Sequence, residues 1–258
     1  MAIDPDSLRE RFGSDPEALI ADNLAEVRGR IEAACARAGR PTGSVRLLPI
    51  SKTVPEPVLR IAYALGLDEL GENKVQEAKA KAEAMADLAI RWTVVGHLQR
   101  NKAKEVARFA SEFQALDSLG VAKALHERLL AEDREIDVLI QVNTSGEATK
   151  FGLAPDEVEA FLDALPAYPR LRPRGFMTLA LFSPDAARVR PCFERLRSLR
   201  DHLSGQTPAG LLPELSMGMS GDYKMAIEEG ATVVRVGQGI FGRRPGSDAH
   251  YWPGLIPG

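Results

Sequence analysis

The chain of 258 residues is 45% hydrophobic and 27% charged, which is typical of a soluble globular protein. Its net charge of −3 gives no support for a nucleic-acid-binding surface, and its two cysteines and four histidines form neither a CxxC motif nor a zinc-binding cluster. The polar N-terminus and the lack of an apolar run of about 20 residues argue against a signal peptide or a membrane helix, so we expect a cytoplasmic protein.

Residues 1–44 are predicted to form a helical extension that packs on the rest of the chain. Asp15 is typical of an N-cap, Pro16 suits the first helical position, and Gly39 is typical of the residue that follows a helix. One long helix over residues 16–38 is therefore expected. It is extra to the repeating pattern that follows, and we expect it to cover the bottom or the side of the next domain.

Short apolar or β-branched runs alternate with amphipathic segments in residues 45–242. The runs recur every 20–40 residues or so, roughly the length of a strand and its crossover helix. Eight such units predict a single-domain α/β protein built as a (β/α)8 TIM barrel, with an open doubly wound sheet as the alternative. The predicted strands are 45–51, 69–71, 92–96, 113–116, 137–143, 175–178, 214–217 and 232–236. Residues 243–258 are rich in Gly and Pro, which indicates a C-terminal coil.

Lys52 is the first candidate functional residue. In a parallel barrel the reactive residues lie at the C-terminal ends of the strands, and Lys52 directly follows the apolar run LLPIS. We expect its side chain to be partly desolvated, which disfavours the ammonium form. A neutral amine is the form that condenses with an aldehyde. The alternative is a lysine whose stem lies on the barrel while its charged end reaches water.

Arg235 lies among apolar residues in the last predicted strand, where an uncompensated guanidinium would be costly. It therefore needs a partner, such as a ligand or a carboxylate. Gly237 and Gly239 follow it and would let backbone N–H groups approach an anion closely. A salt bridge followed by a tight turn is the alternative interpretation.

The stretch ELSMGMSGDYKMA, residues 214–226, joins a predicted strand to a predicted helix. It supplies the hydroxyls of Ser216 and Ser220, and the helix is expected to begin at Ser220 or Asp222. Hydroxyls and N–H groups at a helix N-terminus suit a phosphate. The alternative is an ordinary N-cap without a ligand.

Residues 237–242, GQGIFG, match the pattern GxGxxG literally. A dinucleotide-binding fingerprint opens a helix inside a βαβ unit and is followed by an acidic residue about 20 positions later. Here RRPG and a short tail follow instead. We therefore do not interpret this pattern as a dinucleotide site.

Seven motifs, at or near predicted strand ends, resemble those of the pyridoxal phosphate homeostasis protein family, which shares the barrel of the alanine racemase N-terminal domain. The resemblance covers residues 48–242. Each motif is short, but seven in the same order are highly specific. They are ISKT at 50–53, GENKVQE at 71–77, WTVVGHLQRNK at 92–102, QVNTSGEATKFG at 141–152, GFMTLA at 175–180, LSMGMSGDYKMAIEEGAT at 215–232 and VRVGQGIFG at 234–242.

The resemblance implies that pyridoxal 5′-phosphate (PLP) is held as an internal aldimine on Lys52. It implies that Arg235 faces the pyridine nitrogen, where a cation discourages protonation of the ring. Relatives commonly have Thr or Ser where this chain has Gln238, so a hydroxyl contact to the phosphate is lost while the backbone N–H can still serve. The further residues implied to contact PLP are Ser216, Ser220, Gly237 and Gln238 at the phosphate, Asn73 beside the ring, and Met177 and His97 in the pocket wall.

Two functions compete on this basis. The first is a PLP-binding protein of intracellular PLP homeostasis, which is not an enzyme and hands PLP on to PLP-dependent apoenzymes. The second is a PLP-dependent amino-acid racemase, which needs acid and base groups on opposite faces of the bound substrate. Related racemases take a tyrosine from a C-terminal β domain of the partner subunit, and residues 243–258 are too few to form such a domain.

We therefore expect a carrier, and a monomer, rather than a racemase. None of the chain's own tyrosines is expected over the cofactor. They are Tyr63, Tyr168, Tyr223 and Tyr251. A sugar-phosphate enzyme without PLP would also use glycine-rich loops after the last two strands and is the third possibility.

Overall fold

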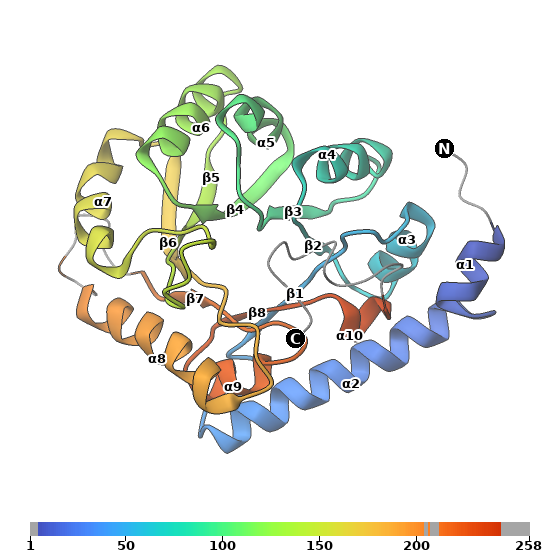
Figure 1. Ribbon diagram of the computed structural model, residues 1–258. Helices are drawn as coiled ribbons and strands as arrows, with labels where there is room; N and C mark the ends of the chain where they lie inside the picture. Colours follow the sequence, from blue (N-terminus) through green and yellow to red (C-terminus); the bar gives the residue numbers. More distant parts are fainter. Residues whose placement is uncertain (1–4, 204–205, 207–211, 244–258) are drawn as a thin grey trace.

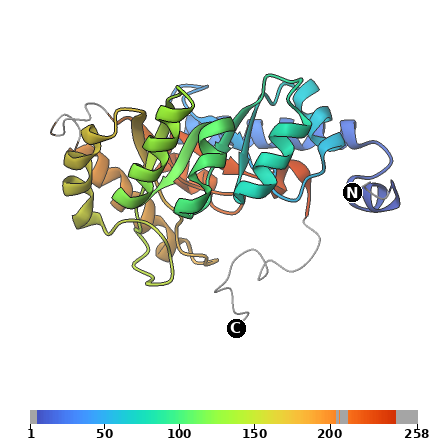
Figure 2. The same cartoon turned by 90° about the horizontal axis from the view of Figure 1, so that it is seen from above.

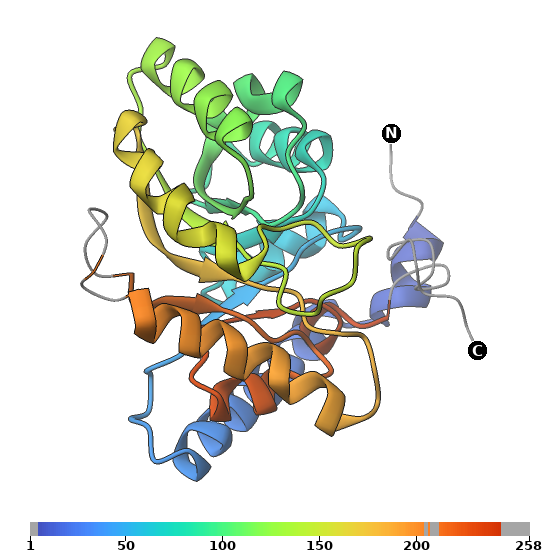
Figure 3. The ribbon, with the colours of Figure 1, turned by 60° about the vertical axis from the view of Figure 1, so that its left-hand side comes forward.

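The protein is an eight-stranded parallel barrel surrounded by helices (Figure 1, Figure 3). The structure is a computed structural model that describes residues 5–203, 206 and 212–243, with side chains described from residue 9 onward. The strand order is β1-β8-β7-β6-β5-β4-β3-β2, and β1 and β2 come together at the closing seam. The predicted (β/α)8 barrel is therefore confirmed and the open doubly wound sheet is wrong.

All eight predicted strands are present, and β4 and β6 begin earlier than predicted. The early part of β6 has exposed side chains, and its backbone is paired with β5, a contact that hydrophobic periodicity does not reveal. The strands are β1 (Arg46–Pro49), β2 (Glu69–Glu72), β3 (Arg91–Val94), β4 (Ala110–Leu116), β5 (Ile136–Gln141), β6 (Leu171–Met177), β7 (Glu214–Ser216) and β8 (Val233–Val236).

Helices follow the strands and cover the outside of the barrel (Figure 2). They are α3 (Glu56–Ala64), α4 (Val75–Ala84), α5 (Ala103–Phe109), α6 (Leu119–Ala131), α7 (Val158–Ala164), α8 (Ala186–Leu203), α9 (Tyr223–Glu228) and α10 (Gln238–Phe241), with 3-10 turns at η1 (Arg100–Lys102), η2 (Pro155–Glu157) and η3 (Leu165–Ala167). Within the described part of the chain, no helix is both long and apolar enough to cross a membrane.

The predicted N-terminal helix is α2 (Pro16–Arg37). Asp15 caps it by accepting a hydrogen bond of 3.0 Å from the N–H of Ala18, and Gly39 follows the helix with φ +64°. The helix lies along the side of the barrel against α3, α9 and α10 (Figure 1). Its buried face consists of Ile20, Leu24, Val27, Ile31, Ala34 and Cys35.

A shorter helix, α1 (Pro5–Phe12), precedes α2 and was not predicted from the sequence. An isolated helix of this length is not stable in water, so tertiary contact must hold it. Phe12 provides that contact because it is 1% exposed and belongs to the hydrophobic core. A single buried aromatic residue leaves too little periodicity to reveal the helix in advance.

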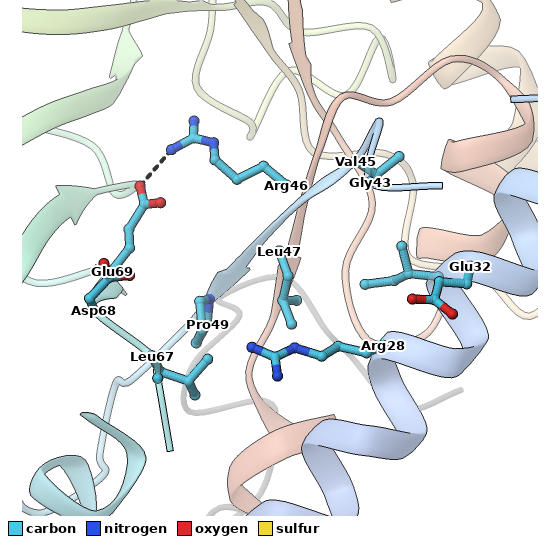
Figure 4. A pocket seen from close by; sticks show the side chains of 12 residues that line it. Arg28, Glu32, Gly43, Val45, Arg46, Leu47, Pro49, Leu67, Asp68 and Glu69 are labelled. Atoms are coloured by element: carbon cyan, nitrogen blue, oxygen red, sulfur yellow. Dashed lines mark hydrogen bonds and ion pairs between the residues drawn. The ribbon is translucent and has the colours of Figure 1, made fainter. Parts of the chain in front are cut away.

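The barrel closes between β1 and β2 with little backbone pairing. The two strands meet at one isolated bridge between Ile50 and Gly71, where the N–H of Ser51 donates to the carbonyl of Gly71 at 2.9 Å. A side chain at Gly71 would force Ile50 to move, because a Cβ would lie 2.6 Å from Cδ1 of Ile50. Toward the N-terminal ends of the strands, a cavity of about 390 Å³ separates β1 and β2 beside α2 (Figure 4).

A charged cluster fills the N-terminal end of the barrel. Nη1 of Arg46 lies 2.5 Å from Oε1 of Glu69 and 2.8 Å from Oε2 of Glu112, and its Nη2 lies 3.0 Å from Oε2 of Glu214 (the first contact is drawn in Figure 4). One guanidinium thus forms ion pairs with three carboxylates. Burial raises the pKa of Glu69 and of Glu214, and the attraction of Arg46 opposes this rise.

We predict that Arg46→Met lowers the free energy of unfolding at neutral pH by about 3–5 kcal/mol, because it leaves buried carboxylates without the cation between them. Burial holds the folded-state pKa of Glu69 and Glu214 above the ordinary value of 4.5. Without Arg46 the attraction that opposes this rise is lost, so the pKa of both carboxyl groups should be higher still in the variant. Acidification from neutral pH then favours folding of the variant more than folding of the wild type, and the deficit should shrink. Denaturant unfolding at several pH values measures it.

Arg37→Met is the matched control, because Arg37 forms an exposed ion pair with Glu228. This variant should lose less than about 1 kcal/mol at any pH. Equal losses in the two variants, or a deficit of Arg46→Met that grows on acidification, would contradict the prediction.

Candidate functional site

A cavity of about 410 Å³ opens at the C-terminal ends of the barrel strands. Its volume suits one small organic ligand. Six predicted site residues line it, namely Lys52, Asn73, Ser220, Arg235, Gly237 and Gln238. The other lining residues, which were not predicted, are Ile50, Val95, Leu179, Leu181, Phe182, Ser183, Pro184, Met219, Gly221 and Asp222. His97, Met177 and Ser216 lie outside this lining.

Lys52 is 9% exposed and follows the closing bridge of the barrel. Ser51, immediately before it, is fully buried, and Thr53, immediately after it, has φ +65°. A β-branched residue is rarely found in this left-handed region, so its surroundings must hold it there. The direction in which Lys52 leaves the backbone is therefore set by contacts made by both of its chain neighbours.

A buried ion cluster, formed by Glu72 of β2 with Glu77 and Lys81 of α4, makes those contacts. Nζ of Lys81 donates to the carbonyl of Ser51 at 2.7 Å, to Oε1 of Glu72 at 2.6 Å and to Oε1 of Glu77 at 2.7 Å. Oε1 of Glu72 also accepts from the hydroxyl of Ser51 at 2.6 Å, and Oε1 of Glu77 accepts from the N–H of Thr53 at 2.6 Å. Both neighbours of the cavity lysine are thus tied to one cluster.

This cluster was not predicted from the sequence, although Glu72 and Glu77 belong to the motif GENKVQE. Glu77 and Lys81 are four residues apart on α4, which is the spacing of a helical ion pair, so a signal was present. Burial raises the pKa of Glu72, and Lys81 opposes that rise. The cluster could not be predicted mainly because Glu72 belongs to a different element, β2, and contacts α4 only in the folded protein.

Arg235 is 3% exposed in the cavity wall. Its Nη1 donates to the carbonyl and the hydroxyl of Ser216, both at 2.7 Å, and its Nη2 donates to the carbonyl of Thr178 at 2.7 Å. Burial lowers the pKa of Arg235 to about 10, against the attraction of Asp222, so the side chain is still a cation at neutral pH. The expected partner was a ligand or a carboxylate. The hydrogen-bond acceptors of Arg235 that the described residues supply are two carbonyls and a hydroxyl, and a ligand as partner stays a prediction.

Ser216 and Met177 lie inside the barrel, beyond the cavity wall. Both are fully buried and are neighbours in the ladder of β6 and β7. The hydroxyl of Ser216 donates to Oε1 of Gln114 at 2.7 Å while it accepts from Arg235. Nε2 of Gln114 donates in turn to Oε1 of Glu112 at 2.7 Å. Ser216 therefore supports Arg235 from within the barrel.

The loops after β7 and β8 form the part of the cavity wall next to the strand end that carries Lys52. Ser220, Gly221 and Asp222 precede α9, and Oδ1 of Asp222 accepts from the N–H of Met219 at 2.6 Å. Gly237 is the N-cap of α10. The first N–H groups of a helix have no carbonyl within that helix to bond, so such an end suits an anion.

Asn73 and His97 lie at the rim. Gly96 approaches Asn73 so closely that a Cβ at position 96 would lie 2.0 Å from the carbonyl oxygen of Asn73. His97 is directed elsewhere, because its Nδ1 lies 3.1 Å from Oδ2 of Asp117 and its ring stacks on Phe151 at 3.9 Å between centroids. Close backbone packing therefore fixes Asn73, whereas His97 belongs to a neighbouring part of the rim.

The tyrosines that the structure describes do not line the cavity. Tyr63 belongs to α3, and Tyr168 makes an edge contact with His126. Tyr223 is buried, and burial raises the pKa of its hydroxyl while Arg30 of α2 opposes that rise. Tyr251 lies outside the described residues, as do positions 244–258 of the predicted C-terminal coil.

Comparison with known proteins identifies this arrangement. Residues 23–245 match the family model of the alanine racemase N-terminal domain. A pyridoxal phosphate homeostasis protein of Aquifex aeolicus is 41% identical over 223 residues, which cover 86% of this chain and 97% of that protein. The structure of PipY from Synechococcus elongatus with PLP bound has a TM-score of 0.76 at 33% identity, covering 86% of this chain and 100% of that one.

A more distant likeness concerns the fold alone. Alanine racemase from Corynebacterium glutamicum has a TM-score of 0.62 at 19% identity, covering 89% of this chain and 62% of that one. The chain therefore belongs to the family of the alanine racemase N-terminal domain and, within it, to the pyridoxal phosphate homeostasis proteins.

Proposed function

We propose that this protein binds PLP, attached covalently to Nζ of Lys52, and that it serves intracellular PLP homeostasis without committed turnover. The observation that carries the proposal is that Lys52, the buried cation of Arg235 and the beginnings of two helices line a single cavity. Relatives named for PLP homeostasis and the PLP-bound PipY support it. Recipients of the PLP would be PLP-dependent apoenzymes.

The residues of the cavity fit the three parts of PLP. Lys52 supplies an amine for the aldehyde, and Ile50 and Leu179 supply apolar surface for the ring. Ser220 and the amides of Gly237 and Gln238 suit the phosphate, because the loops after the last two strands of a parallel barrel commonly bind one. When bound, PLP supplies an aldehyde and an electron-withdrawing ring.

Arg235 favours storage over turnover. Its cation would lie toward the pyridine nitrogen, where it disfavours the protonated ring that strong electron-sink enzymes secure with an acidic residue. Ser216 and Met177 would act from behind the wall, with Ser216 orienting Arg235 through the 2.7 Å hydrogen bond. Asn73 would lie beside the ring, and His97 would border the entrance.

We propose a helical extension in residues 1–44, a PLP-binding barrel in residues 45–242 and a separate C-terminal segment in residues 243–258. The two free cysteines, Cys35 and Cys192, are buried, which is compatible with a reducing cytoplasm. A monomeric state stays a prediction.

We predict that Lys52→Ala abolishes covalent attachment of PLP, because it removes the amine. PLP-treated wild-type protein should absorb visible light, and after borohydride reduction mass spectrometry should locate the added mass on the peptide that contains Lys52. Lys74→Ala is the matched control, since Lys74 is an exposed lysine next to Asn73 at the same rim. An adduct on another side chain, or none in the wild-type protein, would overturn the proposal.

A racemase is the weaker alternative, because none of the described tyrosines lines the cavity to provide a second acid or base. We predict that PLP-loaded protein converts L-alanine to D-alanine no faster than the same concentration of free PLP, as measured by chiral chromatography. Faster conversion that disappears in Lys52→Ala would establish the racemase instead.

A further inference from the structure

Arg11 of the N-terminal helix α1 reaches the backbone beside Lys52. Its Nη1 donates to the carbonyl of Thr53 at 2.5 Å, and its Nη2 lies 3.5 Å from the hydroxyl oxygen of the same residue. Its Nε donates to the carbonyl of Arg243 at 3.2 Å, just beyond α10. One guanidinium therefore joins the loop that carries Lys52 to the segment that follows α10.

The helix that carries Arg11 is itself anchored. Phe12 is 1% exposed, and the guanidinium of Arg11 lies 4.7 Å from the centroid of its ring. The next helix contacts α10 as well, because Nδ2 of Asn23 donates to the carbonyl of Ile240 at 3.0 Å. Arg11 is thus held against the barrel, and its contact with Thr53 is made from a fixed position.

Thr53 needs such a contact because its φ of +65° is unfavourable for a β-branched residue. The N–H of Thr53 donates to Oε1 of Glu77 at 2.6 Å, and the carbonyl of Thr53 accepts from Arg11 of α1. A strained conformation persists only where surrounding groups determine it from several sides. Removing either of these two hydrogen bonds would allow the peptide groups around Lys52 to rotate.

We propose that Arg11 is a positioning residue for Lys52: by holding Thr53 in the left-handed conformation, it keeps the lysine directed into the cavity and slows the loss of bound PLP. The inference rests on the proposed attachment of PLP at Lys52. It assigns α1 a function in retaining the ligand, although this helix lies outside the barrel (Figure 1).

The test compares Arg11→Met with Arg9→Met, which removes the same charge from an exposed position on the same helix. Each protein is loaded with PLP and then exposed to excess hydroxylamine, and the decay of visible absorbance is followed. Loss of PLP should be about tenfold faster in Arg11→Met, since charge-assisted hydrogen bonds are among the stronger ones. Arg9→Met should stay within about twofold of the wild type.

A second background separates positioning from general stability. Thr53→Gly introduces a residue that adopts positive φ without strain. The clamp, meaning the hydrogen bond of Arg11 to the carbonyl of residue 53, is then no longer required. In that background Arg11→Met should change the rate by less than about twofold, because the two effects share one element. An equal acceleration in both backgrounds, or equal rates in Arg11→Met and Arg9→Met, would overturn the inference.

The apoprotein supplies a readout that does not depend on PLP. Hydrogen exchange at the amide of Thr53, measured by NMR, should be faster in Arg11→Met than in Arg9→Met, because the clamp protects this amide. If the wild-type protein forms no adduct at Lys52 but this difference is observed, the proposed function fails while the clamp stands. If the amide exchanges equally in the two variants, the clamp fails.

Discussion

The ion pair between Lys81 and Glu72 is the interaction on which the candidate site depends. It lies directly behind the point where β1 and β2 meet, and it binds Ser51 through both its carbonyl and its hydroxyl. The barrel has only one backbone bridge at this seam within the described residues, so side chains must complete the closure. Burying two charges is expensive, so the presence of such a pair is weak evidence of a net gain in stability. Here the geometry concerned is that of the strand end that carries Lys52.

A continuous chain of hydrogen bonds runs through the barrel interior from one end to the other. Arg235 bonds to Ser216, Ser216 to Gln114, Gln114 to Glu112, and Glu112 to Arg46. Every member has a partner, which is the condition under which a buried polar network is tolerated. Arg235, which faces the cavity, and the cluster around Arg46 at the far end therefore belong to one hydrogen-bond network. A substitution at either end would alter the hydrogen bonds of the other members.

Much of the site could be predicted because its residues lie at strand ends. A parallel barrel brings those ends together, so Lys52, Asn73, Ser220, Arg235, Gly237 and Gln238 could be grouped before any coordinates were known. Ser216 is harder, because β7 has three residues and the direction of a side chain in so short a strand depends on its register with β6 and β8. The left-handed turn at Thr53 has no sequence signal, because threonine is among the residues least expected there.

The contacts of Arg11 with Thr53 and of Lys81 with Glu72 could not be predicted for a different reason. Each joins elements that are separated along the chain, and neither pairing leaves a periodic pattern. A resemblance that begins at residue 48 also says nothing about a helix that ends at residue 12. The order of strands and the chemistry at their ends are local properties, whereas the clamp around Lys52 arises from packing.

The unequal charges at the two ends give the barrel an electrical polarity along its axis. Three carboxylates and one guanidinium occupy the N-terminal end, while two basic residues, Lys52 and Arg235, and one carboxylate, Asp222, line the cavity at the other. This distribution of charge favours the approach of a dianionic phosphate ester to the cavity end over its approach to the N-terminal end. The charges should thus raise the rate at which a phosphate ester enters the cavity. This effect weakens as added salt screens the charges.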